Sequence, residues 1–265
     1  MPHPVPAVTA DVVRRLRAAG CVFAEEEADL LLGQASGAAL DALVARRSAG
    51  EPLEHVLGWA LFCGLRVGVA PGVFVPRVRS ELLAAQAVSR ATAGDVVVDL
   101  CCGSGALGLV VATRVPGVEL HAADVDPAAT ACARENLAAI VPAAHVHEGD
   151  LDAALPPRLR GRVAVLVANV PYVPTAAVAT MPVEARVHEN RVALDGGPDG
   201  LDVQRRVAAA APSWLAPGGA VLVETTQAQA EAAAAAFARH GLRPAVVHDD
   251  DLEATVVVGT APGPS

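Results

Sequence analysis

The chain has 265 residues, of which 53% are hydrophobic, and its formal net charge is −9 at pH 7. This length fits one α/β domain with a small accessory domain, and the apolar content is sufficient for a buried core. All 20 basic residues are arginines scattered along the chain, whereas nucleic-acid binding needs a concentrated basic face. The composition therefore argues against a nucleic-acid partner.

The sequence carries no signal for export or for membrane insertion. It has no run of about 18 apolar residues and no charged N-terminal segment followed by an apolar stretch. Five cysteines, at positions 21, 63, 101, 102 and 132, form no CxxC pair, which favours reduced thiols in a reducing compartment. We expect a cytoplasmic protein that makes no membrane contact.

Residues 1–52 are expected to form a small helical domain. Helical segments are predicted at residues 11–19, 24–32 and 38–48, and each of them ends near a glycine. Their apolar positions are expected to pack into a core of their own rather than to contact a partner.

The first strand of a parallel sheet is expected at residues 96–100, where an apolar run precedes a glycine-bearing turn. Gly103 and Gly105 lie in this turn, and a helix is expected to begin after them. A strand, glycines and a helix N-terminus in this order form a cradle for a nucleotide-type ligand, because glycine lets the backbone approach it. Taken alone, such a turn is a weak signal.

Two further predicted strands are followed by acids. Residues 120–124 end in Asp124, about 20 residues after the glycines, where a ribose hydroxyl pair would be held. Residues 144–147 lead to Asp150, whose carboxylate would accept a hydrogen bond from an adenine amino group. The alternative for both acids is helix capping or a place in a solvated loop.

The most informative feature is Asn169-Val170-Pro171-Tyr172, which follows an apolar strand at residues 163–168. In open α/β sheets, ligands collect at the carboxyl ends of parallel strands. The Asn169 side chain and a neighbouring main-chain carbonyl can accept both N–H bonds of a planar amide or amine, which would orient its nitrogen. A strand-terminating turn is the alternative, because Asn and Pro are common in turns.

Residues 173–190 are expected to form an active-site flap or hairpin. Glu184, His188 and Glu189 within it lack a recognisable ligand set, so no metal is expected. The remaining predicted elements are helices at 200–212 and 227–239, strands at 221–224 and 254–258, the last of them antiparallel, and a disordered tail at 261–265. The alternation of strands and helices predicts an α/β, doubly wound, Rossmann-like sheet.

These residues resemble a known family, the S-adenosylmethionine-dependent methyltransferases that modify the side-chain amide of glutamine in bacterial release factors. The resemblance covers nearly the whole chain from about residue 50 onward. Besides the Asn169 tetrapeptide, it rests on Pro52-Leu53-Glu54-His55-Val56-Leu57-Gly58, Phe62-Cys63-Gly64-Leu65, Phe74-Val75-Pro76-Arg77 and Ala193-Leu194-Asp195-Gly196-Gly197-Pro198-Asp199-Gly200-Leu201. It implies a catalytic domain of the class I methyltransferase type at residues 79–260, joined to the helical domain by a linker hairpin at 53–78.

The resemblance also implies the residues of the site. The cofactor S-adenosylmethionine, which would leave as S-adenosylhomocysteine, is expected to contact Asp99, Cys101, Gly103, Gly105, Asp124, Val125, Asp150, Leu151 and Asn169. The amide clamp falls on Asn169 and the main-chain carbonyl of Val170, with Pro171 and Tyr172 shaping the pocket. Substrate contacts are expected from Phe74, Pro76, Arg77 and Glu224, with a structural hydrogen bond as an equal alternative for Glu224.

Three residues depart from the family pattern. Val170 stands where the family has the first proline of Asn-Pro-Pro-Tyr, which removes the ring that fixes the backbone torsion. Cys101 stands where glycine is usual, so its torsion must tolerate a Cβ. Arg79 replaces an acid near the expected entrance of the active site.

The expected activity is methyl transfer to the side-chain amide nitrogen of a protein glutamine, in the Gly-Gly-Gln loop of a release factor. The three departures leave a small-molecule or peptide amide or amine open as the alternative acceptor. A third hypothesis is a cofactor-binding protein without activity, against which the joint presence of Asp124, Asn169 and Tyr172 argues. The oligomeric state is not predicted.

Overall fold

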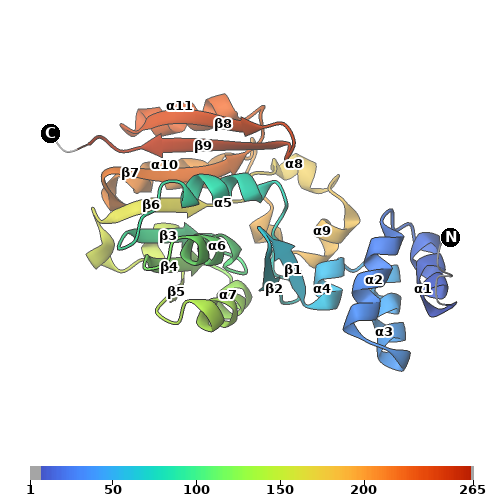
Figure 1. Cartoon of the computed structure of the whole chain (residues 1–265). Helices are drawn as coiled ribbons and strands as arrows, with labels where there is room; N and C mark the ends of the chain where they lie inside the picture. Colours follow the sequence, from blue (N-terminus) through green and yellow to red (C-terminus); the bar gives the residue numbers. More distant parts are fainter. Residues whose placement is uncertain (1–6, 264–265) are drawn as a thin grey trace.

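A seven-stranded sheet forms the centre of the computed structural model, which describes residues 7–263 (Figure 1). The strand order is β5-β4-β3-β6-β7-β9-β8, and every neighbouring pair is parallel except the two pairs that involve β9. The predicted doubly wound α/β sheet with an antiparallel last strand is confirmed. The strands are β3 (Val96–Leu100), β4 (Glu119–Asp124), β5 (His145–Glu148), β6 (Val163–Ala168), β7 (Leu215–Thr225), β8 (Arg243–Asp249) and β9 (Ala254–Thr260).

Helices cover both faces of the sheet, which explains why its central strands are continuous apolar runs. All residues of β3 are buried, as are the last four residues of β6. One core cluster packs the sheet against α5 (Ser80–Val88), α6 (Ala106–Arg114) and α7 (Pro127–Ile140). The other packs it against α10 (Asp202–Trp214) and α11 (Ala230–Arg239), and Trp214 and Phe237 are among its largest buried side chains. Short 3-10 turns at Leu151–Ala154 and Pro157–Leu159 connect β5 to β6.

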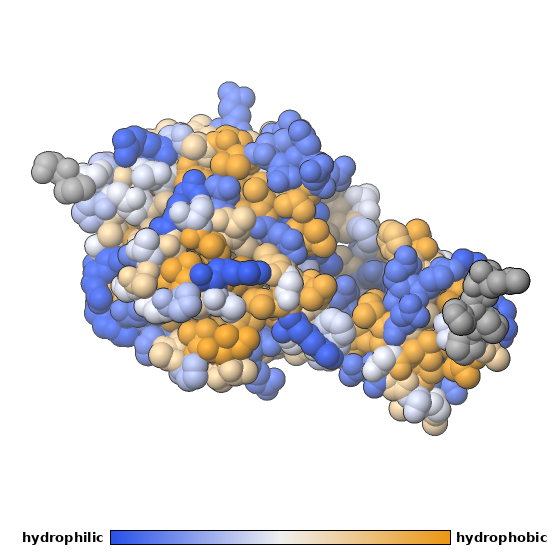
Figure 2. Space-filling model, in the orientation of Figure 1, coloured by the Kyte–Doolittle hydropathy of each residue, from blue (hydrophilic) through white to orange (hydrophobic). Residues whose placement is uncertain are grey.

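The N-terminal helices form a separate lobe beside the part of the molecule that contains the seven-stranded sheet (Figures 1 and 2). Their own apolar cluster is centred on Leu16, Leu31 and Val44, in agreement with the predicted helical domain. On the face shown in Figure 2, this lobe carries apolar as well as polar side chains. Its helices are α1 (Ala7–Ala18), α2 (Ala24–Gln34), α3 (Gly37–Ser48) and the short α4 (Leu53–Leu57), and the hairpin of β1 (Trp59–Phe62) and β2 (Leu65–Gly68) follows.

The predicted flap at residues 173–190 is not a hairpin. It contains two short helices, α8 (Thr175–Val178) and α9 (Val183–His188), and a 3-10 turn follows at Arg191–Ala193. Pro174 and Pro182 directly precede the two helices, with φ of −57° and −49°, and a proline in this torsion range favours the start of a helix over a paired strand. The segment therefore packs as helical turns.

Two further predictions at the C-terminal end need correction. Strand β8 was not predicted, because it is an edge strand that contains a proline and alternates without a clear apolar face. The predicted disordered tail begins too early, since the N–H of Ala261 donates to the Gly219 carbonyl (2.8 Å) and the Pro262 carbonyl accepts from the N–H of Gly218 (3.0 Å). Residues 264–265, like residues 1–6, lie outside the described part of the chain.

Within residues 7–263, no helix is both long and apolar enough to cross a membrane. The five cysteines are free thiols. Cys101 and Cys102 lie in the glycine-bearing turn, and Cys132 lies in α7.

A buried arginine connects two helices of the N-terminal lobe and links the lobe to α9. The Arg47 guanidinium donates through Nε to Glu27 Oε2 (2.6 Å) and through a terminal nitrogen to Glu27 Oε1 (3.0 Å). Its other terminal nitrogen donates to Glu184 Oε1 of α9 (2.5 Å). Both members of the Arg47–Glu27 pair are buried, so neither charge can be left without the other.

We expect Arg47→Met to lower the free energy of unfolding by about 3 kcal/mol, because it leaves the Glu27 carboxylate buried without a partner. Urea denaturation measures this loss. Arg14→Met, at an exposed helix-surface pair with Asp11, is the control and should cost less than about 1 kcal/mol. Adding Glu27→Gln to Arg47→Met should recover part of the loss; equal costs for the Arg14 and Arg47 variants would show that burial of the pair has no energetic weight.

Candidate active site

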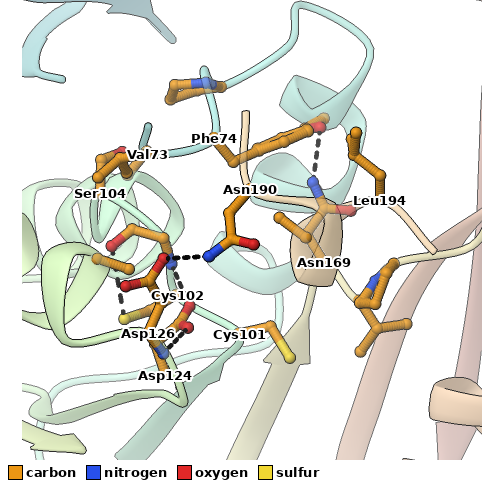
Figure 3. A pocket seen from close by; sticks show the side chains of 18 of the residues that line it. Val73, Phe74, Cys101, Cys102, Ser104, Asp124, Asp126, Asn169, Asn190 and Leu194 are labelled. Carbon is orange, nitrogen blue, oxygen red and sulfur yellow. Dashed lines mark hydrogen bonds between the residues drawn. The ribbon is translucent and has the colours of Figure 1, made fainter. Parts of the chain in front are cut away.

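An open pocket lies at the carboxyl ends of β3, β4 and β6, with a volume of about 1060 Å³ that includes the solvent space at its mouth (Figure 3). Its floor comes from the loops that follow these strands, and residues 72–77 and 190–194 form the opposite wall. Because parallel strands end at the same edge of the sheet, residues far apart in sequence meet here. The structure brings the following predicted residues together in the lining: Cys101, Gly103, Asp124, Val125, Asn169, Val170, Pro171, Tyr172, Phe74, Pro76 and Arg77.

The glycine-bearing turn fits a ligand cradle. Gly103 has φ of +54°, and a Cβ built on it would meet nothing within 4 Å, so its open side faces the pocket. Its N–H donates to Asp124 Oδ2 (2.9 Å), which fixes the turn to the end of β4. Cys101 also has a left-handed φ, +54°, where a residue with a Cβ is strained by about 1 kcal/mol. The cysteine is therefore tolerated in a conformation that favours glycine.

Asp124 is held at the rim of the pocket by backbone donors. Besides Gly103, the N–H of Asp126 donates to Asp124 Oδ1 (2.9 Å). Burial raises the pKa of Asp124, and these backbone hydrogen bonds oppose that rise. Asp124 lines the pocket, and a carboxylate that accepts two backbone hydrogen bonds still has lone pairs for the hydroxyl groups of a ligand.

Four residues predicted to contact the cofactor lie outside the lining. Asp99 is fully buried under the turn, where its Oδ2 accepts from the N–H of Gly108 (2.8 Å). Gly105 is needed for packing, because a Cβ there would lie 3.1 Å from the Cβ of Ala133 in α7. Asp150 forms an ion pair with Arg206 of α10 (2.7 Å), and Leu151 is part of the core under the sheet.

The clamp predicted at the end of β6 presents two free acceptors. Asn169 Nδ2 donates to Ser80 Oγ (3.2 Å), whereas no group of residues 7–263 donates to Asn169 Oδ1. The main-chain oxygen of Val170 also receives no hydrogen bond from the described residues. The Val170 side chain is 1% exposed and packs in the core between β6 and α10. Packing therefore holds the torsion that the family's proline ring would fix.

Glu224 lies behind the pocket, not in its lining. Its Oε1 accepts from the Tyr172 hydroxyl (2.7 Å) and from Arg79 Nε (3.1 Å), and the carboxylate is almost completely buried. Burial raises the pKa of Tyr172, so the phenol stays protonated and donates. Arg79, which departs from the family pattern, thus supplies the charge that balances Glu224. The structure favours the structural alternative for Glu224.

Glycines in the motif at residues 193–201 let the backbone of that segment pack directly on Pro171 and Tyr172. A Cβ on Gly196 would lie 2.7 Å from the carbonyl oxygen of Pro171, and a Cβ on Gly200 would overlap the carbonyl of Tyr172. The Gln229 amide also donates to the Tyr172 carbonyl (3.0 Å). These contacts fix the part of the loop at Pro171 and Tyr172, in addition to the contact of Asn169 with Ser80.

The acids of the predicted flap each have a cationic partner. Arg77 donates to Glu189 Oε1 (2.6 Å) and lies over the Phe74 ring, 5.0 Å from its centroid. Glu184 pairs with Arg47 of the N-terminal lobe. Among residues 7–263, no group of three or more histidines, cysteines or acids is arranged to hold a metal ion.

Among the lining residues that were not predicted, two form hydrogen bonds that join distant segments of the pocket. Ser80 reaches Asn169 across 89 positions of sequence, and Asn190 Nδ2 donates to Asp126 Oδ2 (3.1 Å), which closes residues 190–194 onto the rim (Figure 3). In the sequence, Ser80 is marked only as a hydroxyl residue that follows the motif at residues 76–79. Asn190 is marked only as an amide residue that precedes the motif at residues 193–201. Neither signal identifies a partner without the fold.

Residues 65–199 match the family model described as "Methyltransferase small domain", which with the sheet and the strand-end pocket defines the protein as a methyltransferase. The release factor glutamine methyltransferase of Geobacter sulfurreducens is 37% identical over 204 residues, 77% of this chain and 71% of the relative. That of Moorella thermoacetica is 36% identical over 244 residues, 84% of this chain and 85% of the relative. The chain belongs to the release factor glutamine methyltransferase family, as its motifs predicted.

A solved structure supports the fold independently of close sequence similarity. A methyltransferase from Pyrococcus furiosus is 15% identical, covers 84% of this chain and 98% of its own, and superposes with a TM-score of 0.58.

The buried carboxyl of Asp99 gives the cofactor-free protein a pH-dependent stability. Burial raises its pKa to about 7, above the ordinary 3.8, so the folded state holds the proton more tightly than the unfolded state. The stabilisation is complete below about pH 4 and is lost as the pH rises towards about 7, by roughly 1.4 kcal/mol per unit. A neutral asparagine, which can still accept from Gly108, removes this loss.

We therefore expect Asp99→Asn to exceed the wild type in unfolding free energy by about 1–3 kcal/mol at pH 8, with no gain at pH 4.5. Urea denaturation at the two pH values measures the difference. Asp29→Asn, at an exposed acid of α2, is the control and should change neither value. A gain of equal size at both pH values would show that Asp99 is already ionised at pH 4.5.

Proposed function

We propose that this protein transfers a methyl group from S-adenosylmethionine to the side-chain amide nitrogen of a protein glutamine, in the Gly-Gly-Gln loop of a peptide chain release factor. The observation that carries the proposal is the pair of free acceptors at the end of β6, Asn169 Oδ1 and the Val170 carbonyl. The relatives named above support this acceptor. We also propose a cytoplasmic location, because release factors act in translation.

Two adjacent acceptors match the two N–H bonds of a primary amide. An amide nitrogen is a poor nucleophile because its lone pair is delocalised into the carbonyl. Asn169 and Val170 would turn its nitrogen towards the cofactor side of the pocket and stabilise the positive charge that develops on it. The cofactor supplies an electrophilic methyl group bound to a sulfonium. The acceptor nitrogen would lose one proton to water once the N–C bond has formed, and Tyr172 and Glu224, which bond each other, need not act as bases.

The residues on the β3 and β4 side of the pocket fit this cofactor. Because Gly103 has no side chain, a ligand can approach its backbone closely, and Asp124 and Val125 line the same wall of the pocket. We assign the ribose hydroxyls to Asp124. Asp150, whose carboxylate faces Arg206, is assigned no contact.

The acceptor side of the pocket suits a peptide. Phe74, Pro76 and Arg77 line it together with Tyr172. A second, polar recess shares Arg79 and Tyr172 with the main pocket and extends over the ends of β7 and β8. A glutamine inserted between these walls would leave its neighbouring residues room to cross the recess, whereas a small molecule would need only the main pocket.

The acceptor is tested by incubating the protein with S-adenosylmethionine and a release factor, followed by mass analysis of the peptide that contains the Gly-Gly-Gln loop. We expect a gain of one methyl group on the glutamine. Asn169→Ala should abolish it, because one of the two acceptors is lost, while calorimetry shows nearly unchanged cofactor binding. No methylation by a wild-type protein that binds the cofactor would reject the release factor and favour a small-molecule acceptor.

The cofactor assignment is tested separately by calorimetry. Asp124→Ala should weaken S-adenosylmethionine by about tenfold or more, because a charge-assisted hydrogen bond to the ribose is lost. Asp150→Ala is the matched control at a second strand-end acid and should leave the dissociation constant within about twofold. The reverse result, with Asp150 essential and Asp124 dispensable, would overturn the assignment.

A further inference from the structure

The start of α5 is linked by hydrogen bonds to both ends of the loop at residues 169–172. Ser80 accepts a hydrogen bond from Asn169 Nδ2 (3.2 Å), and Arg79 reaches Tyr172 through Glu224. Ser80 is itself held rigidly: it is 2% exposed, and its N–H donates to the Arg77 carbonyl (2.9 Å). The next residue, Glu81, accepts from the N–H of Cys63, which anchors the turn to the hairpin.

The orientation of the Asn169 amide decides whether the clamp can work. An asparagine side chain presents an acceptor on one side and a donor on the other, and rotation by 180° exchanges them. With Nδ2 on Ser80, Oδ1 is left to accept from an amide N–H of the acceptor, as Figure 3 shows for the Asn169 side chain. In the opposite orientation, two N–H donors would face each other, and the acceptor nitrogen would lose its hydrogen bond.

We infer that Ser80 is a positioning residue for methyl transfer, which anchors the Asn169 side chain in the observed arrangement, with Nδ2 on the Ser80 hydroxyl and Oδ1 left for the acceptor. This role rests on the proposed function of Asn169, but it concerns a contact that exists before any acceptor binds. No other group of residues 7–263 bonds the Asn169 side chain. Loss of the Ser80 hydroxyl therefore frees the amide to rotate.

The kinetic test compares Ser80→Ala with Ser80→Thr, which keeps the hydroxyl. We expect Ser80→Ala to lower kcat by about tenfold, the value of one hydrogen bond, with KM for the acceptor and the cofactor dissociation constant within about twofold. Ser80→Thr should restore most of kcat. Ser89→Ala, at the other end of α5, removes an exposed hydroxyl that donates to the Gln86 carbonyl and accepts from the Arg90 side chain, and it should change nothing.

A second measurement needs no acceptor and separates this inference from the proposed function. The chain has three asparagines, at positions 136, 169 and 190, so asparagine labelled with ¹⁵N gives three side-chain NH₂ groups. The Asn169 NH₂ should be protected from solvent exchange in the wild type and in Ser80→Thr, and lose that protection in Ser80→Ala. The signals of Asn136 and Asn190, whose NH₂ groups bond Gly68 and Asp126, are internal controls.

Unchanged Asn169 protection in Ser80→Ala, or an unchanged kcat, would overturn the role of Ser80. A fall in kcat that Ser80→Thr does not restore, or that comes with an equal loss of cofactor binding, would also overturn it, because the hydroxyl would then act only on the fold. If the wild type fails to methylate a release factor, the proposed acceptor is wrong, and the NMR result still decides whether Ser80 orients Asn169.

Discussion

The site depends on keeping two hydrogen-bond acceptors free at the end of a buried strand. A polar group that is removed from water and left without a partner costs free energy, so a loop with two such groups would relax if it could rotate to satisfy them. Neighbouring groups prevent that relaxation. Gln229 bonds the carbonyl of Tyr172, Gly196 lets a second backbone segment pack on Pro171, and the Val170 side chain is anchored in the core.

The need for these anchors explains why several separate segments contact the short loop at residues 169–172. Catalysis by positioning requires that the acceptors keep their direction when the substrate arrives, and a rigid surround supplies this without a further reacting group. The glycines of the motif at residues 193–201 belong to these rigid surroundings. At Gly196 and Gly200 the missing Cβ matters, because side chains there would push the Pro171 and Tyr172 carbonyls away from their places.

The sequence was most informative where one local rule determines the structure. Continuous apolar runs predicted β3 and β6. The position of Asn169 directly after one of these runs predicted that it lies at the edge of the sheet. Contacts between distant segments were not predictable in this way. The partners of Ser80, Glu189 and Asp150 lie on other elements, and the local sequence of each residue is compatible with several partners.

The resemblance to the family had a similar boundary. It placed Asp99, Gly105 and Asp150 by alignment of motifs, and a motif does not distinguish a residue that lines a pocket from one that supports it. Asp99 lies one layer deeper, against Gly108, and Gly105 allows α7 to approach. The departures from the family were likewise compensated by partners that only the fold reveals, as Arg79 is by Glu224.

Buried acids around the pocket also influence which ligand charge is favoured. Burial raises the pKa of Asp99, Asp124 and Glu189, so the protein without a ligand keeps carboxyl groups in surroundings that disfavour their charge. A cation in the pocket would lower that cost for each ionised carboxylate near it, and a carboxylate that is easier to ionise attracts the cation more strongly in return. The sulfonium of the proposed cofactor is such a cation. In the proposed reaction, acids under and beside the turn would therefore favour a positively charged ligand, while the neutral amide acceptor would be held by hydrogen bonds at the end of β6.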